Sequence, residues 1–141
     1  MLKLLDAVIF NAIAGNADAH GKNFSILHGD KGPSLAPLYD LLATVAWPDL
    51  SPRFAMKIGK RATLAELDAK GWIAFAADAG LGLPLIRRRV VEISEAAIAR
   101  APEVAQVLAG HGLDDEALSN LARVIAERAE RSAMIFRKAP E

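Results

Sequence analysis

Three oxygen-bearing side chains lie close together in the sequence. Asp18 is followed five positions later by Asn23, and Asp40 comes after a segment with the pattern of a hairpin. Phosphoryl transfer needs a carboxylate beside the acceptor hydroxyl, and it needs oxygen ligands for Mg²⁺, which prefers carboxylates, amide oxygens, waters and substrate phosphates. We therefore expect Asp18 to orient or deprotonate the hydroxyl, and Asn23 and Asp40 to hold the metal. The neutral amide of Asn23 would do so without adding a negative charge beside the phosphates.

Two further candidates lie in the same loop, and each has two open interpretations. His20 either contacts phosphate or braces Asp18, or it only hydrogen-bonds the loop. Lys22 either neutralises the transferring phosphoryl group as a second catalytic side chain, or it is a solvated surface lysine.

The segment between Asn23 and Asp40 must bring these two side chains together. Alternating apolar residues predict strands at 24–28 and 35–39, separated by a cluster of turn-forming residues. If the hairpin closes about residues 31–32, pairing places Asn23 opposite Tyr39 and Asp40. The open end of a short ribbon would then carry the metal ligands, with Asp18 just before it.

The rest of the chain is predicted to be helical support. Apolar residues at helical spacing predict a first helix over 2–14, which Gly15 ends because glycine adopts the left-handed conformation of helix ends. The other expected elements, in chain order, are a short helix at 41–47, a strand at 54–58, and one or two helices begun by a capping box at Thr63–Glu66 and ended at Gly80. They are followed by a helix over 84–100, a shorter one from Pro102 to Gly110, and a final helix capped by Asp114 or Asp115.

The composition fits one helix-rich domain spanning residues 1–141. Apolar residues make up 52% of the chain, aromatic residues are few, and there is no cysteine for disulfides or thiolate metal sites. Proteins that bind nucleic acid usually carry an excess of basic residues, whereas the formal charge of this chain is zero. We therefore expect no direct binding of nucleic acid. No apolar run is long enough for a membrane span. We therefore expect a soluble cytoplasmic protein.

The stretch from Gly15 to Ser25, followed by Leu35 to Leu41, resembles the signature of HipA-like serine/threonine kinases, the toxin kinases of bacterial toxin–antitoxin pairs. The resemblance continues more weakly through Ala55–Gly59 and the helices beyond. It implies that Asp18 is the catalytic aspartate and that Asn23 and Asp40 are magnesium ligands. It further implies ATP as cofactor, a serine or threonine of a protein as acceptor, and a helix-turn-helix antitoxin as partner.

The implied fold is mainly α-helical with a small β-hairpin, like the C-terminal lobe of a protein-kinase-like fold. The chain departs from a complete kinase because it has neither Gly-x-Gly-x-x-Gly nor a Walker loop to grip ATP. Ala55–Ile58 echoes the lysine strand of kinases but follows the catalytic loop, which is the wrong order. We therefore expect a C-terminal lobe alone, either an expressed fragment or a truncated gene product, with little or no kinase activity by itself.

Two other functions remain open at this point. The chain could be a non-catalytic helical module that keeps the metal loop as a relic and binds a partner. It could also phosphorylate a small molecule, although such phosphotransferases usually place His-Gly where this chain has Asn16-Ala17. A metal-hydrolase cluster of His20, His28, Asp30 and Asp40 fits no usual zinc spacing. Arg87–Arg89 is more typical of a solvated helix face than of a binding site.

Overall fold

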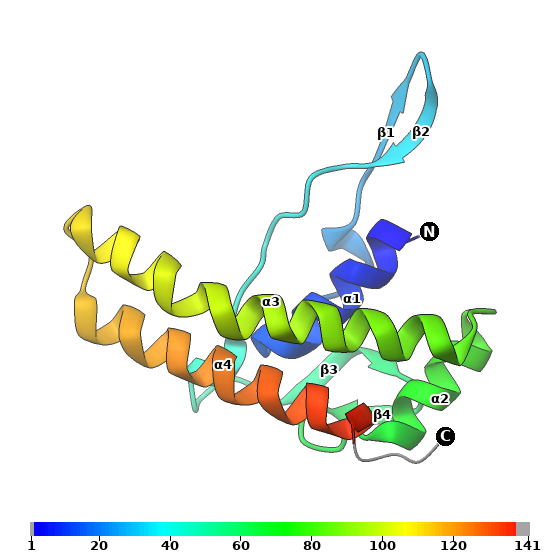
Figure 1. The fold of residues 1–141 in the computed structure, drawn as a ribbon. Helices are drawn as coiled ribbons and strands as arrows, with labels where there is room; N and C mark the ends of the chain where they lie inside the picture. The colour runs from blue at the N-terminus through cyan, green and yellow to red at the C-terminus, as the bar shows by residue number, and fades with distance from the viewer. Residues whose placement is uncertain (1, 138–141) are drawn as a thin grey trace.

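The computed structural model describes residues 2–137, which form a helical body with one projecting hairpin (Figure 1). The helices are α1 (Leu2–Ala14), α2 (Ala69–Asp78), α3 (Leu83–Gly110) and α4 (Asp115–Arg137), with short 3₁₀ helices η1 (Gly21–Asn23) and η2 (Thr44–Ala46). The strands are β1 (Ile26–Gly29), β2 (Gly32–Leu35), β3 (Arg53–Ile58) and β4 (Arg61–Thr63), paired as two antiparallel hairpins. The predicted fold, mainly helical with little sheet, is confirmed.

The core lies where α1 and α2 pack against the long pair formed by α3 and α4 (Figure 1). On α1 the apolar stripe predicted from the sequence is buried, including Leu5, Ile9 and Ile13. Trp72 of α2 and Ile86 of α3 fill the space opposite, each with no more than 1% of its surface exposed. Burial of one helix face against another supplies most of the stability of such an element.

A single helix, α3, spans the region where two helices were predicted. Pro102 lies inside α3 rather than at the start of a new helix. Proline removes one backbone hydrogen bond and crowds the preceding turn, which is why the sequence favoured a break there. The helix continues because α3 packs along α4, and Ala105, beyond the proline, is buried. Tertiary packing therefore outweighs the local cost of the proline.

The start of α4 and the strand at 54–58 agree with the sequence. The Asp114 carboxylate accepts a hydrogen bond from the Ala117 amide at 3.0 Å, so Asp114 caps the final helix. In contrast, the predicted helix over 41–47 is only the 3₁₀ turn η2. Among residues 2–137 no helix combines the length and apolarity needed to cross a membrane.

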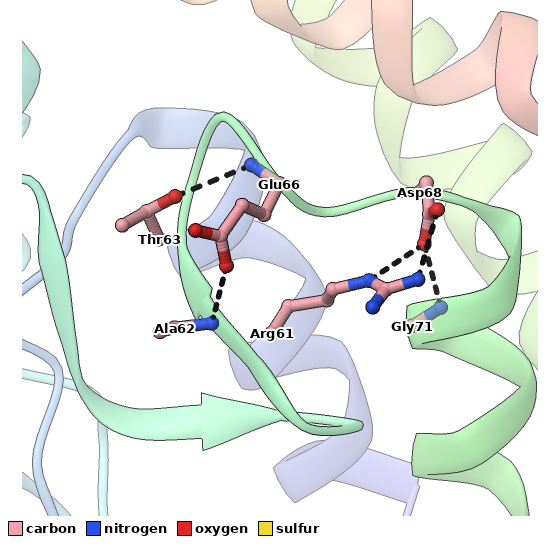
Figure 2. Close-up of polar contacts among 6 residues, drawn as sticks. All are labelled: Arg61, Ala62, Thr63, Glu66, Asp68 and Gly71. Carbon is pink, nitrogen blue, oxygen red and sulfur yellow. Dashed lines mark hydrogen bonds and ion pairs between the residues drawn. The ribbon is translucent and has the colours of Figure 1, made fainter.

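The predicted capping box at Thr63–Glu66 does not begin a helix. The Glu66 amide donates to the Thr63 hydroxyl at 3.3 Å, and the Glu66 carboxylate accepts from the Ala62 amide at 2.9 Å (Figure 2). These bonds close a turn after β4. The cap of α2 is instead Asp68, whose carboxylate accepts from the Gly71 amide at 2.8 Å. Asp68 occupies the extended conformation that a helix cap requires.

Asp68→Ala is expected to lower the free energy of unfolding by about 1 kcal/mol at pH 7, the usual effect of losing a helix cap. The Arg61 guanidinium, which binds the Asp68 carboxylate through two hydrogen bonds of 2.9 and 3.0 Å, and then the Gly71 amide, lower the pKa of Asp68 (Figure 2). A lowered pKa in the folded state means that this stabilisation is complete above the unfolded value of about 3.9 and is lost as the pH falls through the folded value.

Urea unfolding of wild type and Asp68→Ala at a series of pH values measures the difference. It should be largest near neutrality and should shrink below about pH 4. Asp68→Asn is the matched control, because an asparagine still caps the helix but cannot form an ion pair with Arg61. A difference that stays constant into acid would show that the carboxylate charge contributes nothing.

Candidate functional site

The site begins where α1 ends. Gly15 has a φ of +82°, so the chain turns out of the helix in the left-handed region that glycine tolerates. The Thr44 hydroxyl donates to the Gly15 carbonyl and accepts from the Ala17 amide, both at 2.9 Å, and the Val45 amide also donates to Gly15 at 3.2 Å. The loop carrying Asp18 is therefore tied to the segment that follows Asp40.

Arg128 of α4 holds the end of α1, from which this loop leaves. Its guanidinium donates from Nη2 to the Ala12 carbonyl at 2.7 Å and from Nε to the Ile13 carbonyl at 3.1 Å, the last turn of α1. A cation at the C-terminus of a helix is favourable because the free carbonyls there carry partial negative charge. Burial, followed by the nearby Arg131, lowers the pKa of Arg128. The sequence did not reveal this residue, since nothing local marks a contact between segments so far apart.

The hairpin brings Asn23 to Asp40, but in a register different from the predicted one. Ile26 pairs with Leu35 and Gly29 with Gly32, so the turn lies at residues 30–31 rather than 31–32. The return strand spans Gly32–Leu35, and the predicted strand at 35–39 is wrong. A two-residue turn is the common solution for a tight hairpin, and Gly32 supplies the φ of +93° that follows it. Beyond Leu35 the chain runs back towards the body without regular pairing.

Asn23 Nδ2 donates a hydrogen bond of 2.8 Å to Asp40 Oδ2, so the two predicted metal ligands are in direct contact. Asn23 is buried, whereas Asp40 is exposed to solvent. Asp40 has a φ of +56°, in the left-handed region that aspartate and asparagine enter more readily than other side chains do. An aspartate at position 40 therefore suits the left-handed backbone conformation as well as the predicted binding of a metal.

Tyr39 fixes the spacing between the loop and the returning segment. Its hydroxyl donates to the Lys22 carbonyl at 2.8 Å and lies 2.8 Å from the hydroxyl of Ser25. These contacts cross the ribbon beside the contact between Asn23 and Asp40. Sequence reasoning gave Tyr39 no role beyond its place in the strand, although a tyrosine next to a candidate ligand is a signal for such bracing.

The other three candidates differ in how they are held. Asp18 is exposed, and its backbone amide donates to the Asn16 side chain at 3.1 Å. His20 precedes η1, and its Nδ1 is buried with no hydrogen-bond partner within the part of the chain that the structure describes. Lys22 is exposed. The structure thus joins Asn23 and Asp40 directly, and places His20 and Lys22 on the same loop with no side-chain hydrogen bond to Asn23 or Asp40.

The donor set suits a hard divalent cation. A carboxylate and an amide in contact offer three oxygens. The amide can turn about its last side-chain bond so that either its nitrogen or its oxygen faces Asp40. Over residues 2–137 no group of three or more histidine, aspartate or glutamate side chains could hold a metal. The hydrolase cluster of His20, His28, Asp30 and Asp40 is therefore not formed.

The chain is similar to several known proteins. Residues 1–105 match the family model described as the HipA-like C-terminal domain. The chain is 55% identical over 130 residues to the Sinorhizobium fredii protein named "Putative kinase Y4mE", covering 92% of this chain and 31% of that protein. It is 37% identical over 84 residues to the serine/threonine-protein kinase toxin HipA of Shewanella oneidensis, covering 57% of this chain and 18% of that protein.

A solved structure from Shewanella oneidensis, of the toxin–antitoxin system HipA and HipB with operator DNA, has a similar fold. The TM-score is 0.75 at 25% identity, over 97% of this chain and 33% of the solved chain. The chain thus spans about a third or less of the length of these relatives.

Proposed function

The chain belongs to the HipA-like C-terminal domain family, and from that premise we propose that it is the catalytic-loop lobe of a serine/threonine protein kinase. The observation that carries the proposal is the contact of 2.8 Å between Asn23 and Asp40, which joins two predicted magnesium ligands 17 positions apart. Relatives named as kinases support the same class of reaction.

Each candidate side chain has a role in the proposed reaction. Asp18, whose carboxylate is on an exposed loop, would accept the proton of the attacking serine or threonine hydroxyl. Asn23 and Asp40 would hold Mg²⁺, which when bound neutralises the charge on the phosphates of ATP. His20 would contact a phosphate or brace Asp18, and among residues 2–137 its buried Nδ1 has no hydrogen-bond partner. Lys22 would add positive charge beside the transferring group.

A partner also belongs to the proposal. In the Shewanella oneidensis complex, HipA is found together with HipB and operator DNA. We extend this to an antitoxin that binds the complete protein and, through it, DNA. The formal charge of this chain is zero, which favours contact with DNA through the partner rather than through the chain itself.

The test is an assay of the full product of the gene that encodes this chain. Incubated with Mg²⁺ and ATP labelled at the γ-phosphate, it should transfer label to serine or threonine of protein, identified by mass spectrometry, and EDTA should abolish the transfer. Label found only on small molecules would favour the small-molecule phosphotransferase. No transfer to any acceptor, together with intact binding of a protein partner, would favour the non-catalytic module.

A further inference from the structure

Asn16 is a polar side chain at the centre of the loop, with only 2% of its surface exposed. Its amide nitrogen donates to Asn11 Oδ1 at 2.8 Å and to the backbone carbonyl of Asp40 at 3.2 Å. Its amide oxygen accepts from the backbone amide of Asp18 at 3.1 Å. Both N–H groups and the carbonyl oxygen are therefore used, which is the pattern expected of a buried amide that has a fixed place.

The partners of Asn16 belong to the two separate segments of the site. Asp18 lies on the loop after α1, and Asp40 lies on the segment that returns from the hairpin. One side chain thus holds the backbone of the proposed base and the backbone of the proposed metal ligand. Asn11, buried on α1 and itself bonded to the Ala7 carbonyl at 2.9 Å, anchors Asn16 to the rigid helix.

No substitution of similar size reproduces this set of bonds. Aspartate has the same shape and can accept from Asp18, but it has no N–H to donate to Asn11 or to the Asp40 carbonyl, and its charge would repel both oxygens. Alanine loses all three bonds. Because a buried polar group left without its partner is costly, each change should alter the positions of the groups around it.

We propose that Asn16 is a positioning residue that fixes the place of Asp18 relative to Asp40. The catalytic effect of Asn16 rests on the proposed kinase function. The hydrogen bonds by which Asn16 links the two segments do not depend on that function. Displacing a catalytic group by about 1 Å can lower the reaction rate about 100-fold. A side chain that is bonded to both segments would therefore affect the rate by holding Asp18 and Asp40 at the right separation.

The geometric link is tested by nuclear magnetic resonance on the 141-residue chain. In Asn16→Ala the backbone amide of Asp18 should exchange with solvent about 2- to 10-fold faster, since its acceptor is gone. In Asn16→Asp the exchange of Asp18 should stay near wild type, because the acceptor remains. The side-chain amide signals of Asn23 should shift in both variants, since the contact of Asn23 with Asp40 is disturbed.

The catalytic consequence is tested in the full gene product. Asn16→Ala and Asn16→Asp should lower kcat about 10- to 100-fold while KM for the protein acceptor stays within about twofold. Val90→Ala is the control for lost stability alone, because Val90 is fully buried in α3 and belongs to the hydrophobic core rather than to the hydrogen bonds of Asn16. It should destabilise the fold but leave kcat and the Asp18 and Asn23 signals unchanged.

The outcomes separate this inference from the proposed function. If the wild-type protein transfers no phosphate, the kinase proposal fails, and the resonance signals alone decide whether Asn16 links the segments. If the wild type is active and both variants keep wild-type kcat and unshifted Asn23 signals, the inference is overturned and the kinase proposal stands.

Discussion

Asp40→Asn is expected to reduce phosphoryl transfer by the full gene product by about 100-fold or more. A metal ion that neutralises charge stabilises the transition state by several kcal/mol. A variant that binds the metal more weakly should lose much of this stabilisation. Asparagine keeps the size of the side chain and tolerates the φ of +56° at this position, so the backbone should stay in place. The variant therefore removes one negative charge from the site without removing its shape.

Titration with Mg²⁺ distinguishes this effect from loss of the base. Asp40→Asn should need more Mg²⁺ to reach its residual maximal rate. Asp18→Asn should lose about 10² to 10⁴ in rate, the usual contribution of a positioned proton acceptor, with an unchanged requirement for Mg²⁺. Equal behaviour of the two variants would contradict the division of roles between Asp18 and Asp40.

Asp30→Asn is the matched control for both variants. It makes the same chemical change, and Asp30 lies in the exposed turn between β1 and β2, at the far end of the projecting hairpin (Figure 1). Its rate and its Mg²⁺ requirement should equal those of wild type. If Asp30→Asn lost as much activity as Asp40→Asn, net charge rather than ligation would explain the effect.

The sequence predicted that Asn23 and Asp40 meet, but it did not predict the side chains that support their loop. Asp18, Asn23 and Asp40 lie in short motifs whose residue types and spacing led to the prediction. The contact between Asn23 and Asp40 is confirmed, although the predicted register is not. Thr44 and Arg128 were missed. Each acts through a bond to the backbone of a segment distant in sequence, and such bonds leave no periodic pattern.

The fold shows the same division between local and distant causes. The bounds of α1 were predicted because an apolar stripe and a following glycine are local signals. The proline inside α3 and the capping motif after β4 are also local signals, yet both predictions failed. Packing of α3 along α4 overrides the proline, and Asp68 rather than Thr63 occupies the cap because the chain between them is needed to turn from β4 into α2.

Gly59→Ala is expected to lower the free energy of unfolding by more than about 4 kcal/mol, a loss that few single substitutions reach and that overpacking against backbone atoms can cause. Gly59 lies in the turn between β3 and β4, where a Cβ would stand 1.8 Å from the Gly71 carbonyl oxygen and 2.7 Å from the Phe75 amide nitrogen of α2. Both obstacles are backbone atoms of a helix, so neither can rotate away. Small domains are stable by only about 5–15 kcal/mol, so this loss would remove a large part of the stability of the fold.

Gly80→Ala separates this clash from backbone strain. Gly59 and Gly80 both have positive φ, +49° and +64°, but nothing lies within 4 Å of a Cβ at Gly80. Left-handed backbone costs alanine about 1–2 kcal/mol, which should be the whole loss in Gly80→Ala. Urea unfolding of the 141-residue chain followed by circular dichroism compares the two variants. Losses of equal size would mean that β3 and α2 can move apart freely. A loss several times larger at Gly59 requires close contact between this turn and α2, on which the burial of the neighbouring Ile58 depends.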